Sequence, residues 1–278
     1  MPRSLRRLRP LSQLLPEGVR PKLSVLMPVY NEADTVAQIV DEVLAFESLR
    51  FDIELVIVES NSTDGSRDVV ESYKADPRVT LILQSAARGK GNAVRAALAE
   101  ATGDIILIQD GDLEYQVSDY GALVDPIVDG EADFVLGTRY VKGQPIRWVP
   151  GSPLLSHTMN AAHWMFAALF DVTYNARLRD PFTMFKVFRT DAVRDIDFVA
   201  DRFDFDWELM AKLLRAGYEP LEVPIRYQAR GFTTGKKIRP FADPPTWVWA
   251  CVKFRFAPLR TAGGASGTSR SRGAPPGR

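Results

Sequence analysis

Two aspartates separated by one glycine, Asp110 and Asp112, directly follow the strand-like stretch 104–109, and Glu114 comes two residues later. A largely apolar run of this length is typical of a buried strand in a parallel sheet. Ligands bind such sheets beyond the carboxyl ends of the strands. Carboxylates placed there repel each other unless a cation lies between them, and Mg²⁺ or Mn²⁺ accepts carboxylate oxygens together with substrate phosphates. Taken alone, the triplet is equally compatible with a metal site and with an ordinary Asp/Gly turn.

A second segment that could do chemistry, residues 88–92 (RGKGN), opens a stretch with helical periodicity. Cations and a glycine-lined backbone at the N-terminus of a helix suit a diphosphate. A solvated Arg and Lys pair beside a helix start is the structural alternative. Two further polar loops, residues 27–32 and 59–66, also follow apolar runs.

The elements that must position these loops alternate between strands and helices. Apolar runs predict strands at residues 22–30, 53–58, 79–83 and 104–109, and helical spacing predicts helices at residues 33–48, 66–74 and from 89 onward. This alternation predicts parallel βαβ units and a doubly wound α/β sheet. No Gly-x-Gly-x-x-Gly follows the first strand and no Walker loop occurs, which disfavours dinucleotide oxidoreductases and P-loop enzymes.

The second half of the chain has a different character. We expect strands at residues 132–139, within 180–189 and at 219–227, helices at 154–170 and 205–215, a basic glycine-containing loop at 230–237, and an aromatic, basic segment at 246–256. Pro224 predicts that strand 219–227 lies at a sheet edge, because proline cannot donate to a ladder. Helix 154–170 is apolar nearly all round, which predicts deep packing or contact with a membrane surface.

Composition excludes several classes of function. The 278 residues are 46% hydrophobic and 25% charged, which is ordinary for a soluble globular protein. Thirty-five basic and 35 acidic residues cancel, so no global charge favours nucleic acid. A single cysteine, Cys251, excludes an internal disulfide and a Cys-rich zinc site. We expect no membrane-spanning helix, because no run of 18 uncharged apolar residues occurs, and no signal peptide, because residues 1–10 carry four arginines and no apolar core.

In this order and spacing, the loops resemble those of the inverting glycosyltransferases of family 2, and most of all the polyprenyl-phosphate sugar synthases of the dolichyl-phosphate mannose synthase type. The resemblance runs over residues 22–237. It implies a GT-A fold, in which a mostly parallel, Rossmann-like sheet is flanked by helices and joined by a smaller acceptor-side region. We therefore expect a basic N-terminal tail at residues 1–21, a catalytic domain at 22–258 (a nucleotide-sugar half at 22–115 and an acceptor half at 116–258) and a disordered tail at 259–278.

The resemblance assigns the first-half loops to the donor and a metal. Its nucleotide-sugar-binding positions are Pro28, Tyr30 and Glu32 in the P-x-Y-N-E loop, Glu59 and Ser60 where the family carries Asp-Asp, Arg88, Gly89 and Lys90 in the G-K-G-x-A segment, and Asp110 and Gly111 in the DxD motif. It implies that Asp110, Asp112 and Glu114 hold Mg²⁺ or Mn²⁺, with Glu114 standing where many relatives carry Gln. Ser60 lacks the family's second carboxylate, which bears on the choice of base.

Acceptor-side positions follow from the same resemblance. Arg139 matches the arginine that faces an acceptor phosphate, and Asp180, Arg230, Lys236 and Lys237 match positions near the acceptor or diphosphate. Asp112 and Arg139 are candidate catalytic residues. If the acceptor is a hydroxyl, a general base is needed, for which Asp206 is the first candidate and Glu208 the second. Either carboxylate could instead be structural.

The resemblance implies a metal-dependent transfer, with inversion, from a UDP- or GDP-sugar to a polyprenyl phosphate at the membrane surface. The Arg-rich N-terminus, helix 154–170 and segment 246–256 favour peripheral contact with a membrane, and we expect a cytoplasmic protein on the inner face of the cytoplasmic membrane. The alternatives are a hydroxyl acceptor (saccharide or small molecule), a non-catalytic nucleotide-sugar-binding homologue, which Ser60 favours and the Asp110–Asp112 pair disfavours, and a nucleotidyltransferase. A nucleotidyltransferase usually carries a glycine-rich loop after the first strand, and this chain has no such loop there.

Overall fold

The computed structural model describes residues 9–146, 148, 151–228 and 243–259. One seven-stranded sheet has the order β3-β2-β1-β4-β6-β5-β7. Its strands are β1 (Lys22–Val29), β2 (Asp52–Glu59), β3 (Val79–Leu83), β4 (Ile105–Ile108), β5 (Phe134–Thr138), β6 (Lys186–Arg189) and β7 (Leu221–Pro224). Strands β1 to β4 are mutually parallel, and β6 runs antiparallel to both β4 and β5. The sheet is therefore mostly parallel, as predicted, and β7 lies at its edge.

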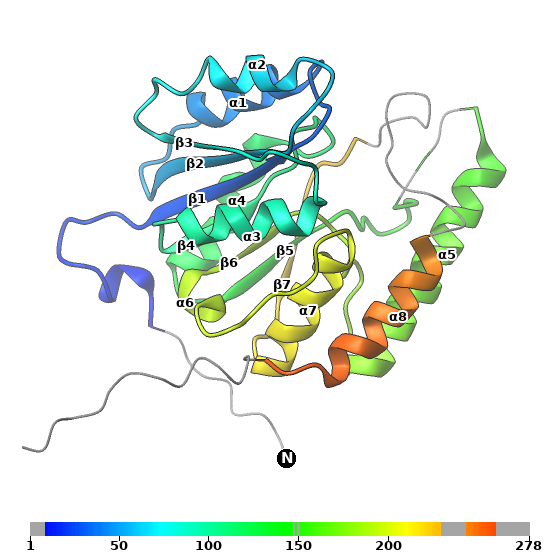
Figure 1. Cartoon of the computed structure of the whole chain (residues 1–278). Helices are drawn as coiled ribbons and strands as arrows, with labels where there is room; N and C mark the ends of the chain where they lie inside the picture. Colours follow the sequence, from blue (N-terminus) through cyan, green and yellow to red (C-terminus); the bar gives the residue numbers. More distant parts are fainter. Residues whose placement is uncertain (1–8, 147, 149–150, 229–242, 260–278) are drawn as a thin grey trace, which may run out of the picture.

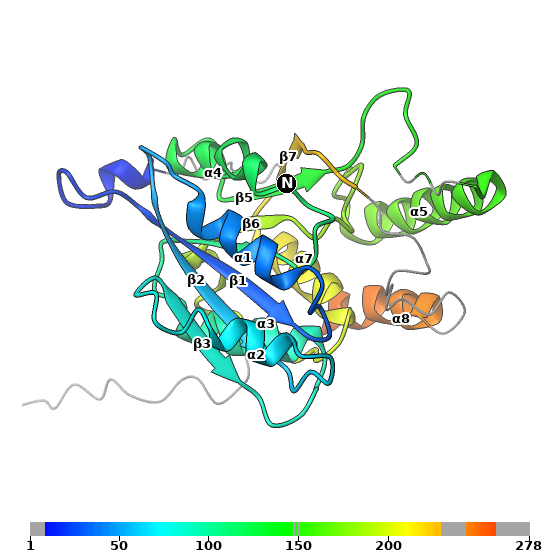
Figure 2. The same cartoon turned by 90° about the horizontal axis from the view of Figure 1, so that it is seen from above.

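Helices cover both faces of the sheet (Figures 1 and 2). They are α1 (Val36–Ala45), α2 (Ser66–Glu71), α3 (Lys90–Glu100), α4 (Tyr120–Val128), α5 (Pro153–Tyr174), α6 (Thr190–Val193), α7 (Asp204–Ala216) and α8 (Asp243–Phe256), with short 3₁₀ turns η1 (Leu11–Gln13) and η2 (Val117–Asp119). Successive side chains of a strand point to opposite faces. In β1, Leu26 accordingly joins the core under α3 and α7, whereas Val25 and Met27 join the core under α1 and α4.

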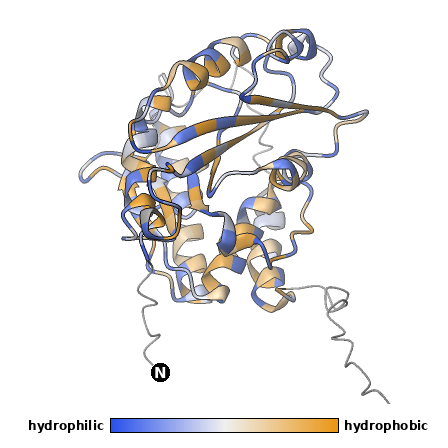
Figure 3. Ribbon diagram, turned by 90° about the vertical axis from the view of Figure 1, so that its left-hand side faces the viewer, coloured by the Kyte–Doolittle hydropathy of each residue, from blue (hydrophilic) through white to orange (hydrophobic). Residues whose placement is uncertain are grey.

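The helices carry hydrophobic and hydrophilic bands, as expected of elements that bury one face (Figure 3). Helices α5 and α8 extend beyond the sheet (Figure 1). They pack side by side: the Tyr174 hydroxyl donates to the Cys251 carbonyl at 2.7 Å, and the Phe166 and Trp247 ring centroids lie 5.6 Å apart. None of the helices in the described part of the chain combines the length and hydropathy needed to cross a bilayer.

Part of the predicted N-terminal tail packs against the domain. Leu11 is buried in the core under α4, and the Arg189 guanidinium donates to the Arg9 carbonyl at 3.3 Å. Residues 1–8 and 260–278 lie outside the described residues. The helix expected at residues 33–48 begins only at Val36, because Asn31 adopts a left-handed conformation with φ of 51° and turns the chain before the helix.

Candidate active site

The loops after β1 and β2 are joined to each other at the carboxyl edge of the sheet. The Asn31 and Glu32 amides donate to the side-chain oxygens of Ser62 and Ser66 at 2.9 and 2.8 Å. In return, the Thr63 amide donates to the Asn31 side chain at 2.9 Å. The left-handed backbone of Asn31 makes this exchange possible, since it aims two successive amides at the neighbouring loop. The two predicted donor loops therefore form one rim.

Glu59 and Ser60, at the carboxyl end of β2, support this rim from inside the protein. The buried Glu59 carboxylate accepts the Ser62 amide and the Arg67 guanidinium, each at 2.5 Å. Burial alone would raise the pKa of Glu59, but the Ser62 hydrogen bonds and the Arg67 charge outweigh it and lower the pKa. The Ser60 hydroxyl donates to the Gln84 side chain at 3.0 Å. Both Glu59 oxygens are thus engaged within the protein, and its predicted contact with the base or ribose stays a prediction.

Lys90, the first residue of α3, pairs with the first aspartate of the DxD motif. Its ammonium lies 2.5 Å from Asp110 Oδ1 and 3.6 Å from Met184 Sδ. Burial would lower the pKa of Lys90, but Asp110, and then Asp206 and Asp112, raise it above its usual value. Lys90 therefore stays charged among three carboxylates that lie up to 116 residues from it in the sequence.

The glycines around Lys90 admit a neighbouring loop. A Cβ on Gly89, whose φ is 109°, would lie 2.4 Å from the Asp201 carbonyl oxygen, and a Cβ on Gly91 would lie 2.5 Å from that of Ala200. The Asn92 amide already donates to the Asp201 carbonyl at 3.0 Å. Gly89 and Gly91 are therefore required for close packing against the neighbouring loop. The prediction that this segment binds a diphosphate did not include this structural reason.

The other predicted donor positions lie along the same edge. Pro28 is inside β1 opposite Val58, whereas Tyr30 and Arg88 are exposed. The Gly111 carbonyl accepts the Thr35 hydroxyl at 2.8 Å, which ties the DxD turn to the loop before α1.

Asp110 and Asp112 offer the hard oxygen donors that Mg²⁺ or Mn²⁺ prefers, so the donor set fits such an ion. Asp112 is largely buried, and its Oδ1 accepts the Glu114 amide at 3.0 Å. The Glu114 carboxylate accepts the Tyr227 hydroxyl at 3.1 Å. Among the described residues, no three His, Cys, Asp or Glu side chains are grouped closely enough to hold a metal. The carboxylates could serve a cation that completes its shell with phosphate oxygens.

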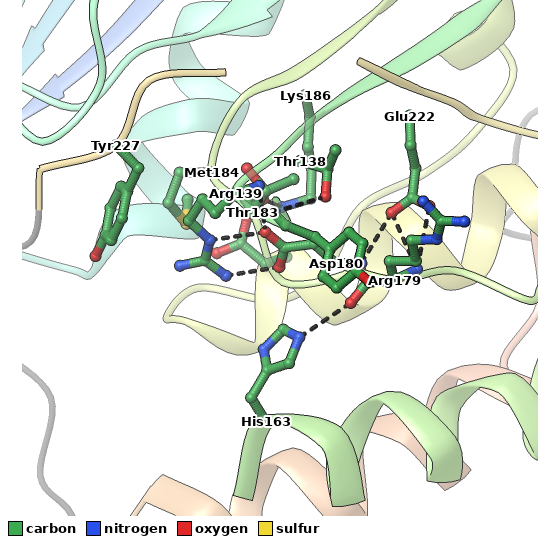
Figure 4. A network of polar contacts seen from close by, with 12 residues as sticks. Thr138, Arg139, His163, Arg179, Asp180, Thr183, Met184, Lys186, Glu222 and Tyr227 are labelled. Atoms are coloured by element: carbon green, nitrogen blue, oxygen red, sulfur yellow. Dashed lines mark hydrogen bonds and ion pairs between the residues drawn. The ribbon is translucent and has the colours of Figure 1, made fainter. Parts of the chain in front are cut away.

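Arg139 and Asp180 form a buried, bidentate ion pair (Figure 4). The Arg139 amide, Nε and Nη2 donate to the two Asp180 oxygens at 2.9, 2.8 and 2.7 Å. Burial would raise the pKa of Asp180, but the Arg139 charge and its hydrogen bonds lower it to about 2. The Arg139 guanidinium also lies over the Tyr227 ring, 5.1 Å from its centroid. The structure thus brings two predicted acceptor residues together.

Two side chains fix the loop that carries Asp180. The Glu222 carboxylate on β7 accepts the Arg179 and Asp180 amides at 3.0 and 2.8 Å, and burial raises the pKa of Glu222. His163 on α5 lies 3.0 Å from the Arg179 carbonyl through its Nε2 (Figure 4). Helix α5 is therefore linked to the Arg139–Asp180 pair through one imidazole.

Asp206 faces the same site from α7. Its carboxylate lies 3.2 Å from the ammonium of Lys186, a fully buried residue of β6 that also donates to the Thr183 carbonyl. Burial lowers the pKa of Lys186, an effect that Asp206 opposes and Lys90 reinforces.

Glu208 points elsewhere. It is fully buried, accepts the Val199 and Ala200 amides at 2.9 and 2.8 Å, and pairs with Lys212 at 2.7 Å. Of the two roles considered for Glu208, the geometry favours the structural one.

Three residues of the site were not identified from the sequence: Lys186, Glu222 and His163. Of these three, only Lys186 gave a signal in the sequence: it lies in the short strand KVFR, and a lysine that is buried there needs a partner of opposite charge. Arg230, Lys236 and Lys237 lie outside the described residues.

An exposed apolar ridge lies on α5 and α8. Its members keep 60–87% of their surface exposed, and they are Leu154, Met165, Val172, Trp249 and Phe256. Exposed Lys253 and Arg255 lie in the last turn of α8. Large exposed apolar side chains gathered on two packed helices point to a surface for contact with a partner or a membrane.

A sequence model of glycosyl transferase family 2 matches residues 24–196. Glycosyltransferase AglJ of Haloferax volcanii is 26% identical over 220 residues, covering 79% of this chain and 67% of that protein. Dolichol-phosphate mannosyltransferase of Pyrococcus furiosus is 26% identical over 216 residues, covering 76% of this chain and 58% of that protein.

Among solved structures, glucosyl-3-phosphoglycerate synthase from Mycobacterium tuberculosis, in complex with Mn²⁺, UDP and phosphoglyceric acid, superposes with a TM-score of 0.63 at 18% identity, covering 84% of this chain and 78% of that one. Mannosyl-3-phosphoglycerate synthase from Rubrobacter xylanophilus gives a TM-score of 0.59 at 19% identity, covering 87% and 78%. This likeness concerns the fold, and it confirms the GT-A architecture predicted from the sequence.

Proposed function

Since the chain belongs to glycosyl transferase family 2, we propose that it moves a sugar, with inversion at the anomeric carbon, from a UDP- or GDP-sugar to a polyprenyl phosphate at a membrane surface. The observation that carries the acceptor class is the exposed apolar ridge on α5 and α8, on a helix that contacts the acceptor-side loop. The dolichol-phosphate mannosyltransferase of Pyrococcus furiosus is compatible with this acceptor.

Donor binding rests on the rim formed by the loops after β1 and β2, and on the Lys90–Asp110 pair. Lys90 is a charged donor beside the start of α3, where a diphosphate is favoured. Asp110 and Asp112 would hold Mg²⁺ or Mn²⁺, with Glu114 beside them, and such an ion stabilises the charge of the leaving nucleoside diphosphate. Solved relatives of the same fold contain Mn²⁺ and UDP, which supports this donor class.

The ridge suits a lipid surface. Large apolar side chains beside Lys253 and Arg255 match an interface of acyl chains and anionic headgroups. Each basic residue near such a surface adds roughly 1 kcal/mol of attraction. A lipid phosphate would then arrive from the membrane on the side of α5.

His163 connects this ridge to the acceptor site. It lies on α5 and contacts the Arg179 carbonyl, next to the Asp180 that holds Arg139. Docking of α5 on a membrane would therefore be transmitted, through the His163–Arg179 hydrogen bond, to the neighbouring Asp180 and its partner Arg139, the arginine proposed to face the acceptor phosphate.

The reaction needs little proton transfer if the acceptor is a phosphate. An acceptor phosphate oxygen forms a bond to the anomeric carbon while the bond from that carbon to the diphosphate oxygen breaks. The nucleoside diphosphate leaves with the electron pair, and no proton has to be removed. Positioning by the chain's cationic residues would then supply most of the rate acceleration.

A hydroxyl acceptor is the second candidate. Asp206 is the carboxylate at the site that would take the hydroxyl proton, and it lies 3.2 Å from the Lys186 ammonium. The solved relatives named for their 3-phosphoglycerate products support this class.

The test compares acceptors and membrane attachment together. Purified protein is incubated with radiolabelled UDP- and GDP-sugars, with polyprenyl phosphate in anionic vesicles or with soluble saccharides and 3-phosphoglycerate. Wild type should float with the vesicles and label the lipid, whereas the double variant Trp249→Glu/Phe256→Glu should do neither and still bind nucleotide. Leu49→Glu, at an exposed leucine outside the ridge, should behave as wild type. Labelling of soluble acceptors alone, without flotation, would reject the lipid-phosphate proposal.

A further inference from the structure

The Lys90 ammonium is bound to Asp110, a carboxylate that a metal ion would need. Its ammonium lies 2.5 Å from Asp110 Oδ1, and both side chains are largely buried, at 13% and 22% exposed. A hydrogen bond between charged groups at this distance is among the strong ones. The first DxD aspartate is therefore already neutralised by the chain itself.

A divalent cation and the Lys90 ammonium cannot share Asp110 without repulsion. Two positive groups on one small, largely buried carboxylate repel each other strongly. A cation entering alone must therefore displace Lys90 or bind against its charge.

The displaced ammonium has few other partners on the protein. The other carboxylates whose charges act on Lys90 are Asp206 and Asp112. Asp206 already pairs with the buried Lys186, and Asp112 is the second aspartate of the proposed metal site. A donor diphosphate brings new anionic oxygens to the start of α3, where Lys90 stands.

From these contacts we infer that Lys90 is an exchangeable counter-ion, which pairs with Asp110 before metal and nucleotide bind and moves to the diphosphate when they do. This inference rests on the proposed function, because it takes the donor to be a nucleoside diphosphate sugar. Lys90 thereby makes metal and nucleotide binding depend on each other, and the dependence is reciprocal. Metal alone binds weakly, and the nucleotide strengthens it.

The test measures Mn²⁺ binding rather than turnover. Free Mn²⁺ is followed by its electron paramagnetic resonance signal, with Mn²⁺ alone and with saturating UDP or GDP, in wild type, Lys90→Met and Lys90→Arg. Lys90→Met should bind Mn²⁺ alone about tenfold more tightly or better, since the metal no longer breaks a charged hydrogen bond. The factor by which nucleotide strengthens Mn²⁺ binding should shrink by a similar amount.

Two controls separate exchange from a general loss of charge. Arg95→Met removes a positive charge from the same helix without touching Asp110 and should leave Mn²⁺ binding as in wild type. Lys90→Arg keeps the charge and should keep the strong dependence on nucleotide. If circular dichroism shows that Lys90→Met does not fold, Lys90→Gln provides the same comparison.

The outcomes distinguish this inference from the proposal on which it rests. If Lys90→Met binds Mn²⁺ alone no more tightly than wild type, or if Arg95→Met tightens it equally, the exchange is wrong. If wild type binds no Mn²⁺ with either nucleotide, the metal-dependent function itself fails.

Discussion

Replacing Asp180 by asparagine should destabilise the protein by about 3–5 kcal/mol, because it leaves Arg139 as a buried charge without its counter-ion. The Asp180 carboxylate is fully buried and accepts three hydrogen bonds from Arg139. Its pKa of about 2, against an ordinary 3.8, corresponds to a preference of the native state for the ionised form of about 2 kcal/mol. Most of the expected loss is therefore the cost of an unpaired guanidinium.

The assay is equilibrium unfolding in urea at pH 7, extended to a double-mutant cycle with Arg139→Met. The double variant should be more stable than the sum of the single losses predicts, by about 2 kcal/mol or more, because it removes both charges. Arg20→Met, at the exposed Arg20–Asp52 pair, is the matched control and should cost less than about 1 kcal/mol. A loss below about 1 kcal/mol for Asp180→Asn, or strict additivity, would refute the buried-pair reasoning.

Three further predictions concern acid, packing and Glu208. Because the folded pKa of Asp180 lies below its ordinary value, its contribution to stability is complete above about pH 4 and is lost as the pH falls toward 2, so the stability gap between wild type and Asp180→Asn should narrow by about 2 kcal/mol in urea titrations over that range. Gly91→Ala should lower stability by about 1–3 kcal/mol, since its methyl group would meet backbone at 2.5 Å, whereas Gly121→Ala in α4, with open space around it, should be neutral or stabilising in thermal melts. Glu208→Gln should cost about 2–4 kcal/mol in urea, and loss of sugar transfer at unchanged stability would instead make Glu208 the base.

The four parallel strands of the first half were predictable because burial on both faces demands a continuous apolar run. The strand expected at residues 79–83 coincides with β3, the one expected at 22–30 ends one residue beyond β1, and those expected at 53–58 and 104–109 differ from β2 and β4 by one residue at each end. The carboxyl ends of parallel strands meet at one edge, so the sequence also predicted which loops would gather there.

The second half was harder to predict because its arrangement is set by contacts between distant segments. Helix α4 was missed, since Gly121 and Pro126 weaken its local signal, although its apolar face fills the core under β5 and β6. The position of β6, antiparallel between β4 and β5, depends on pairing with strands up to 84 residues away in sequence, and no local pattern encodes it.

Residue types identified the loops of the site but not the partners of its side chains. Arg139 and Asp180 were both assigned to the acceptor side, yet their bidentate pairing across 41 residues follows only from the fold. The Lys90–Asp110 pair likewise joined two segments that had been assigned separately to diphosphate and metal. Pairing is a property of tertiary structure, and it decides whether a charged residue serves a ligand or another residue.

The spacing of Asp206 and Glu208 alone could have separated their roles. Residues two positions apart on a helix point in directions about 200° apart, so the two side chains cannot both face one site. In α7, Asp206 faces Lys186, while Glu208 holds the Val199 and Ala200 amides.

Glu208 still acts on the site from a distance. The backbone that it holds, at Ala200 and the adjacent Asp201, packs against Gly91 and Gly89 on either side of Lys90. Helix α7 thus contributes in two ways, with one carboxylate at the site and the other supporting the loop that places the start of α3. Because Lys90 begins that helix, the position of its ammonium at Asp110 depends on the buried Glu208 as well as on the loop in which the lysine lies.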